Sequence, residues 1–258
     1  MEVSVSSASG AGGVQSVDRA LDILEIMAAA GGQIGLSELA ETAGLPLPTI
    51  HRLTRALVAR GYVRQLPSRK YVLGPKLVRL GESASQSIGA WSRPHLAELV
   101  RVTGETANMA VLDDAMAVYV AQVPSEHSMR MFTEVGRRVY PHCTGVGKAL
   151  LAQLPDDAVR GIVTRTGMPQ QTPNTVTDPE ALLADLATIR ARGYAIDEGE
   201  QEVGVRCFAV VVPGAPTPTA VSISGPAARV TLESAEHVVP TLRRVAADLG
   251  AEFGSAAL

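Results

Sequence analysis

The sequence predicts a mixed α+β protein of two domains, in which a small helical domain precedes a larger domain with helices around an antiparallel sheet. Three observations predict it. Residues 14–60 carry apolar side chains at helical spacing, short strand-like segments follow residue 104, and the two parts of the chain carry opposite charge. With 258 residues, of which 46% are hydrophobic, the chain is long enough for two separate cores.

Charge is unevenly distributed along the chain. Between Glu41 and Glu82 there is no acidic residue, and eight lysines and arginines occupy that window. From Gly81 onward, 20 acidic residues accompany 14 lysines and arginines. The net charge of −3 hides this contrast. A basic segment followed by an acidic remainder indicates that any contact with nucleic acid belongs to the first domain.

The N-terminal residues and the cysteines exclude several classes of protein. Residues 1–13 are rich in serine and glycine without periodicity, so we expect a disordered tail. No segment approaches the roughly 20 apolar residues that cross a bilayer, and no secretory signal is visible, so we expect a cytoplasmic protein without a membrane partner. Cys143 and Cys207 are too few for a disulfide framework and form no C-x-x-C pair. We expect neither a metal nor a cofactor.

Three helices are predicted within residues 14–60. The second ends at the Gly-Leu-Pro sequence that begins at Gly44, and the third opens at Pro48 and runs to about Arg60. The periodic apolar positions of the first helix are Val17, Ala20, Leu21, Leu24 and Met27. The positions of the third helix expected to face the core are Ile50, Leu53, Leu57 and Val58.

A short hairpin is predicted after the third helix. Residues 62–64 and 70–73 read as strands around a turn at residues 65–69. Helix, helix, turn, helix and hairpin is the order of a winged helix-turn-helix, which we assign to residues 14–75. Such a domain places its third helix in the major groove of DNA and its hairpin beside the phosphates.

Each residue expected to contact DNA either carries a polar or cationic side chain or lies in the first turn of the third helix. A solvated charged face is the alternative for any one of them, but the absence of acidic neighbours favours DNA for the set. They are Pro48, Thr49, His51, Arg52 and Arg55 on the helix, and Arg64, Arg69 and Lys70 on the hairpin.

A linker helix is predicted over residues 76–90, and a second, α+β domain over residues 91–254, where the apolar pattern alternates between periods of two and 3.6 residues. The predicted strands are residues 106–112, 117–123, 129–132, 207–212 and 220–223. The predicted helices are residues 92–104, 145–153, 180–192 and about 232–249.

Six stretches between Gln15 and about Phe253 resemble the IclR family of bacterial transcriptional regulators. They are QSVDRALDILE, LSELAETAGLPLPTIHRLTRALVARGYV, YVLGPKLVRLG, HCTGVGKALLA, ARGYAIDEGEQEVGVRCFA and VSISGPAARV. The resemblance implies a winged-helix domain, a linker helix and a GAF-like effector-binding domain. It also implies operator DNA as a partner, and homodimers that pair into dimers of dimers.

The same resemblance implies which residues line an effector pocket. They are Gly145, Val146, Asp197, Cys207, Ser222 and Ser224. Backbone N–H groups at a helix N-terminus favour a carboxylate, and the serine and cysteine side chains complete a small polar pocket. The effector half is most similar to regulators of allantoin and glyoxylate use, which implies a small organic acid such as glyoxylate or allantoate. One departure is the turn at residues 213–218, which is short for the family.

The expected pocket residues and their neighbours also have structural explanations, which the sequence does not exclude. Cys207 is also explained as a buried structural thiol, and the hydroxyls of Ser222 and Ser224 as partners of neighbouring backbone. Glu200 is expected on a solvated loop face. His142 and Cys143 are expected to serve packing.

The predicted function is a ligand-responsive repressor, and an activator of the same architecture is the nearest variant. An amidohydrolase of small ureides, with Cys207 or Cys143 as nucleophile and His142 or His127 as base, is the alternative from another class. That alternative does not explain the basic window, and no nucleophile elbow or phosphate loop is visible. We therefore expect a regulator and not an enzyme.

Overall fold

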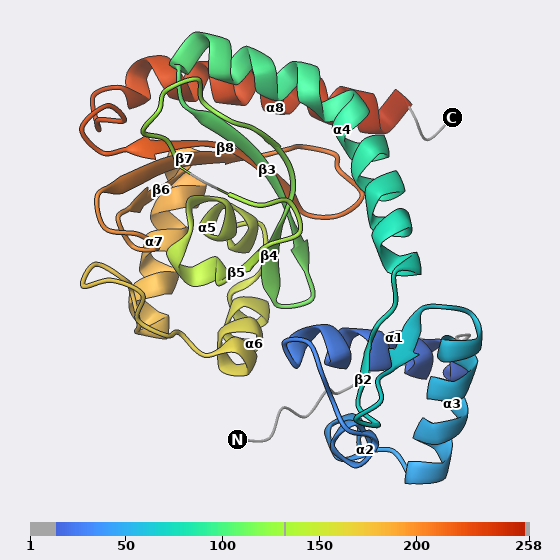
Figure 1. The fold of residues 1–258 in the computed structure, drawn as a ribbon. Helices are drawn as coiled ribbons and strands as arrows, with labels where there is room; N and C mark the ends of the chain where they lie inside the picture. The colour runs from blue at the N-terminus through green and yellow to red at the C-terminus, as the bar shows by residue number, and fades with distance from the viewer. Residues whose placement is uncertain (1–13, 132, 256–258) are drawn as a thin grey trace. The chain divides into compact units, whose positions relative to one another are not determined.

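The computed structural model describes residues 14–131 and 133–255, so the predicted tail over residues 1–13 lies outside the described residues. It confirms the mixed α/β class, with a helix-turn-helix in the N-terminal part and a curled sheet in the C-terminal part (Figure 1). The chain divides into two compact units, of which one ends at Ala84 and the other begins at Ser85. None of the described helices is long and apolar enough to cross a bilayer.

The first unit holds three helices and one antiparallel hairpin, as the sequence predicts. Its core forms around Ile23, Leu39 and Ile50, one from each helix, and all three are fully buried. Ile34 bridges the second hairpin strand at Tyr71 and so ties the hairpin to the helices. The elements are α1 (Gln15–Ala29), α2 (Leu36–Ala43), α3 (Leu47–Ala59), β1 (Val63–Gln65) and β2 (Tyr71–Leu73).

One predicted core position of the first unit, Val58, was wrong. On α3, Thr54 is buried and Val58 is 37% exposed, because Thr54 lies one turn after Ile50 on the buried stripe and Val58 lies beside that stripe. On α1, Val17 and Leu21 are more than half exposed. The apolar residues of α1 therefore occupy two faces, one in the core and one open.

The second unit is built on a six-stranded sheet in the order β5-β4-β3-β8-β7-β6, and every neighbouring pair is antiparallel. Two strands, β3 and β8, lie at its centre although more than 100 residues separate them in the sequence. The strands are β3 (Thr106–Asp113), β4 (Met116–Val123), β5 (Arg138–Val139), β6 (Ala195–Glu198), β7 (Val205–Val211) and β8 (Thr219–Pro226).

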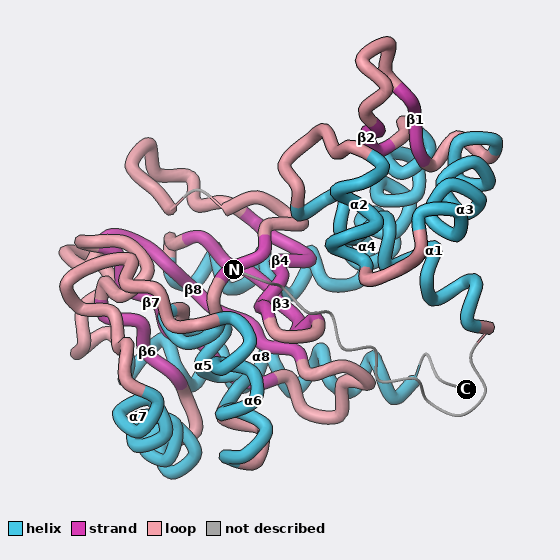
Figure 2. Tube along the Cα trace, turned by 90° about the horizontal axis from the view of Figure 1, so that it is seen from below, coloured by secondary structure: helices cyan, strands magenta, loops and turns pink. Residues whose placement is uncertain are grey.

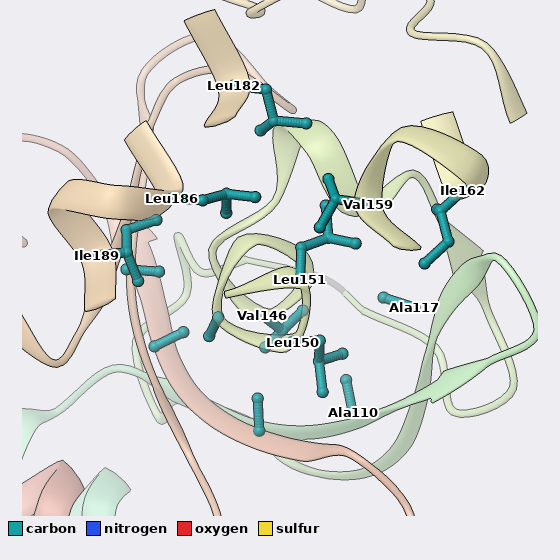
Figure 3. Close-up of a cluster of buried hydrophobic side chains, with 14 of the residues drawn as sticks. Ala110, Ala117, Val146, Leu150, Leu151, Val159, Ile162, Leu182, Leu186 and Ile189 are labelled. Carbon is teal, nitrogen blue, oxygen red and sulfur yellow. The ribbon is translucent and has the colours of Figure 1, made fainter. Parts of the chain in front are cut away.

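Helices cover both faces of this sheet. On one face, α5 packs against β7 and β8, and its apolar side chains meet those of α6 and α7 (Figure 3). On the other face, α8 and the C-terminal part of α4 lie side by side (Figure 1). Figure 2 shows the sheet from the side on which α5, α6 and α7 lie. The helices are α4 (Lys76–Thr103), α5 (Gly145–Leu151), α6 (Asp156–Thr166), α7 (Pro179–Arg192) and α8 (Ala235–Ser255), and a 3-10 turn, η1, covers Pro141–Cys143.

Several predicted elements of the second unit need correction. The linker helix and the helix after it are one helix, α4, because Pro94 lies inside the helix and does not open a new one. Met129–Met131 form no strand, and Phe132 lies outside the described residues. Helix α6 was not predicted, although its buried residues Val159, Ile162 and Val163 lie at helical spacing. Strand β6 was not predicted either, since its four residues are too few to establish an alternating pattern.

Candidate DNA-contact surface and effector pocket

The predicted DNA contacts on the helix lie at its exposed side. Pro48, His51, Arg52 and Arg55 are exposed on α3, and Thr49 is half-buried. A shallow hollow on this side is lined by His51, Arg52 and Arg55 together with two alanines. This side is free because the opposite stripe of α3 packs into the core.

The remaining predicted contacts lie on the hairpin, where Arg64, Arg69 and Lys70 are exposed. Its turn is closed by two backbone bonds, from the N–H of Leu66 to Lys70 and from the N–H of Arg69 to Leu66. Arg69 has φ 63°, in the left-handed region that costs a non-glycine residue about 1–2 kcal/mol. The turn therefore carries an arginine at a position where glycine fits with less strain.

These cations are free to meet an anion. Within residues 14–131 and 133–255, every recorded ion pair lies in the second unit, and none involves the arginines or the lysine of α3 and the hairpin. Exposed positive charges without acidic neighbours are the electrostatic requirement for binding DNA phosphates.

In the second unit, three of the expected pocket residues form one row across the sheet. Asp197 on β6 pairs with Cys207 on β7, and Cys207 pairs with Ser224 on β8. Ser222 lies on the same face, because alternate residues of a strand point the same way. All four are buried, with at most 7% of the residue exposed. The strand pairing thus gathers side chains that lie far apart in the sequence.

Helix α5 begins directly over this row. A Cβ atom added to Gly145 would lie 2.6 Å from the sulfur of Cys207, so only glycine allows the close approach. The side chain of Val146 points into the apolar core instead (Figure 3). Only the backbone of Val146 is therefore available to a ligand. Thr144 caps the helix by accepting the N–H of Gly147.

Two polar residues beside the row were not predicted. The amide of Asn108 donates to the Ser224 hydroxyl over 3.2 Å, and Gln122 donates to Asn108 over 3.1 Å. The hydroxyl of Ser222 is buried beside the thiol of Cys207 and makes no hydrogen bond of ordinary geometry among the described residues. Neither serine bonds to neighbouring backbone as the structural interpretation expected. The sequence signal that could have identified Asn108 and Gln122 was their polar character within the otherwise apolar strands β3 and β4.

Asp197 is held by the turn that follows it. Its Oδ1 accepts the N–H of Glu200 over 2.7 Å, and the hydroxyls of Thr172 and Thr175 donate to the backbone oxygen of Glu200. The expected solvated position of Glu200 was wrong, because only 6% of the residue is exposed. Its carboxylate faces the ammonium of Lys148 on α5, which satisfies the charge that burial would otherwise penalise.

The electrostatics of the two cysteines argue against a nucleophile. Burial raises the pKa of Cys207 to about 12 and that of Cys143 to about 12, so both stay thiols near neutral pH. Burial also lowers the pKa of His142, whose Nε2 lies 3.3 Å from the Pro169 carbonyl oxygen. No group of three His, Cys, Asp or Glu in the described part of the chain is placed to hold a metal ion.

We predict that Gly145→Ala selectively weakens effector binding. The new methyl would push α5 away from the Cys207 sulfur and displace the N–H groups expected to meet a carboxylate. Loss of one hydrogen bond to a charged group costs about 1.5–3 kcal/mol, or about 10- to 150-fold in affinity. Isothermal titration with the effector measures the loss. Gly161→Ala on α6, where nothing lies within 4 Å, is the matched control and should leave the affinity unchanged. Equal affinities for both variants would contradict the assigned site.

Comparison with known proteins agrees with this arrangement. Residues 16–67 match the IclR helix-turn-helix domain, and residues 83–251 match the C-terminal domain of the bacterial transcriptional regulator IclR. The transcriptional repressor IclR of Escherichia coli K12 is 40% identical over 238 residues, which cover 88% of this chain and 85% of that protein.

Solved structures extend the likeness to the whole fold. An IclR-type regulator from Silicibacter sp. TM1040 superposes with a TM-score of 0.79 at 30% identity, over 93% of this chain and 96% of the other. An IclR homologue from Microbacterium hydrocarbonoxydans, crystallised with 4-hydroxybenzoate, superposes with a TM-score of 0.68 at 25% identity, over 93% and 99% of the two chains.

Proposed function

Since the chain belongs to the IclR family of ligand-responsive transcriptional regulators, we propose that it is a repressor whose effector is a small carboxylate such as glyoxylate or allantoate. The buried Ser222 hydroxyl carries this proposal, because it makes no hydrogen bond of ordinary geometry among the described residues and lies beside Asp197, Cys207 and Ser224. A buried polar atom without a partner is costly, and a ligand oxygen would satisfy it.

We assign each pocket residue a role toward such an acid. The N–H groups of Gly145 and Val146 meet the carboxylate, with the hydroxyl of Ser222 as a further donor. Asp197 meets a second polar group of the ligand, and Cys207 limits the size of the site. Ser224 is oriented by Asn108.

The composition of the chain favours an aliphatic acid. The homologue from Microbacterium hydrocarbonoxydans was crystallised with 4-hydroxybenzoate, an aromatic hydroxy acid. Only 3% of this chain is Phe, Trp or Tyr, so aromatic side chains to stack on a flat ring are scarce. An aromatic acid is therefore the second candidate.

We infer that Arg52 and Arg55 read bases or phosphates in the major groove, with Pro48, Thr49 and His51 at the entry of the same helix. Arg64, Arg69 and Lys70 contact the adjacent backbone. Effector binding shifts the population toward a conformation that fits the operator less well, which couples the two units.

A direct binding measurement tests the ligand class. Thermal unfolding of the purified protein with glyoxylate, allantoate, acetate and 4-hydroxybenzoate should raise the melting temperature for at least one of the first two, because a ligand that binds only the folded state stabilises it. The acid that stabilises the protein should lose its effect in Cys207→Leu. Stabilisation by 4-hydroxybenzoate alone would replace the aliphatic class with the aromatic one.

We propose that the functional unit is a homodimer, paired into a dimer of dimers. The open face of α1 supports the first contact, since Val14, Val17 and Leu21 lie at helical spacing and are 64%, 52% and 56% exposed. An apolar stripe on an exposed helix is stabilised when a second copy covers it.

Leu21→Glu is expected to weaken the dimer at least ~100-fold, since a carboxylate would be desolvated at the contact. Light scattering coupled to gel filtration should show half the wild-type mass. Stability of the monomer should change little, because Leu21 is exposed within one chain. Ser16→Glu, an exposed position on another side of α1, is the control and should keep the wild-type mass; a Leu21→Glu variant that also keeps the wild-type mass would rule out this face.

A further inference from the structure

The pocket is short of positive charge. The ammonium of Lys148 lies 2.5 Å from Glu200 and 2.8 Å from Asp185, so two carboxylates already share it. Lys148 is the only lysine or arginine that forms an ion pair with this cluster in residues 14–131 and 133–255. One carboxylate oxygen of Glu200, Oε2, is buried without a hydrogen-bond partner among these residues. The cluster is anionic before Asp197 is counted.

Asp197 is the fourth ionisable group of this cluster, and it has no cation of its own. Its carboxylate accepts the backbone N–H of Glu200 on Oδ1, and the backbone N–H of Gln201 and the more distant ammonium of Lys148 also favour its charged form. The titratable groups that act on Asp197 from the packed elements are Glu200 on the turn, Lys148 on α5, Cys143 on η1, Cys207 on β7 and Tyr119 on β4, with Asp185 on α7 behind Lys148.

The remaining donors of the pocket are neutral. Ser222 offers a hydroxyl, and burial keeps Cys207 a thiol by raising its pKa to about 12. Burial also raises the pKa of Tyr119 well above its ordinary value. A ligand carboxylate would thus enter a buried site that holds an ionised aspartate and no unshared cation. Two like charges within a buried site cannot both stay ionised without a large penalty.

We propose that the effector site takes a monocarboxylate together with one proton, which resides on Asp197 and is donated in a hydrogen bond to the acid. This inference rests on the proposed effector class and adds the charge state in which that class binds. Asp197 then acts as a hydrogen-bond donor that discriminates between monocarboxylates and dicarboxylates, since a second ligand charge would require a second proton.

The pKa of Asp197 in the free protein agrees with a proton on this residue. Burial raises the pKa of Asp197 to about 7, and the N–H groups of Glu200 and Gln201 and the ammonium of Lys148 oppose that rise only in part. Above this pKa, each unit of pH lowers the protonated fraction tenfold. The affinity for a carboxylate should therefore fall about tenfold per pH unit in alkaline solution and level off in acid.

Titration calorimetry with glyoxylate at pH 8, in phosphate and in triethanolamine, tests the proposal. The two buffers differ in ionisation enthalpy, so the difference in measured heat counts the protons taken up. We expect about one proton per glyoxylate for the wild type and none for Asp197→Asn, whose amide donates permanently. Between pH 8 and pH 9 the affinity should fall about tenfold in the wild type and stay constant in Asp197→Asn. Binding by the wild type without proton uptake would overturn the proposal.

A second measurement needs no ligand. Infrared spectra of the free protein should contain a protonated-carboxyl band that disappears with a midpoint near pH 7 and that is missing from Asp197→Asn. Glu202→Gln, an exposed position after the same turn, should retain the band. If glyoxylate fails to bind while the band is present, the effector assignment fails and the protonated aspartate stands. If the band is absent from the wild type at pH 6, the protonated aspartate is wrong whatever the ligand.

Discussion

Replacing both Arg52 and Arg55 with alanine is expected to abolish specific operator binding and to leave effector affinity unchanged. Both side chains are exposed on α3, three residues apart and therefore on one side of the helix. Loss of an arginine that reads a base costs about 1–3 kcal/mol, so each single variant should bind about 5- to 150-fold more weakly. Fluorescence anisotropy with labelled operator at fixed salt measures the change.

The control for this prediction removes the positive charge of an arginine outside the proposed DNA-contact surface. Arg101 lies on α4 in the second unit, with 75% of its side chain exposed, and Arg101→Ala should bind the operator like the wild type. The salt dependence gives a further check, because each lost phosphate contact flattens the slope of log K against log salt by about one. An Arg52→Ala/Arg55→Ala variant with wild-type operator affinity would refute α3 as the recognition helix.

Lys148→Met is expected to destabilise the second unit by several kcal/mol. It leaves the carboxylates of Glu200 and Asp185 facing a buried apolar group, and removal of one partner of a buried ion pair costs about 3–5 kcal/mol. Urea unfolding near neutral pH measures the loss. Arg160→Met on α6, whose ion pair with Glu180 is exposed at the surface, is the control and should cost at most about 1 kcal/mol.

The stability of Lys148→Met should also depend on pH in a defined direction. Burial raises the pKa of Glu200 even with Lys148 present, and removal of the ammonium takes away the cation that lowers it. A carboxyl whose folded-state pKa exceeds its unfolded value destabilises the fold above that pKa, so the variant should regain stability as the pH falls from 7 toward 5. Lys148→Met/Glu200→Gln should recover part of the loss at pH 7. A pH-independent deficit would place the cost in packing instead of charge.

The first unit was largely predictable from local pattern. Helical spacing, the glycine breaks and the turn at residues 65–69 suffice for three helices and a hairpin, because each is a short-range feature. The misplaced Val58 shows the limit. Apolar character alone put it in the core, whereas the 3.6-residue period places Thr54 on the buried stripe.

The candidate effector pocket could not be predicted from local sequence pattern. Asp197, Cys207 and Ser224 were expected there only through the resemblance, and their neighbourhood depends on strand pairing that no spacing specifies. Asn108 and Lys148 were missed for the same reason, since their partners Ser224 and Glu200 lie 116 and 52 residues away. Glu200 was wrongly expected at the surface, because the local sequence does not reveal that the ammonium of Lys148 pairs with its buried carboxylate.

The most direct test of a ligand-released repressor is the fluorescence anisotropy of the purified protein on labelled DNA from the region upstream of its own gene, with and without the acid that stabilises it. We predict specific binding that survives excess unrelated DNA and that the acid weakens by at least ~5-fold, the lower end of ordinary coupling between two sites. Specific binding that the bound acid strengthens or leaves unchanged would contradict this mechanism.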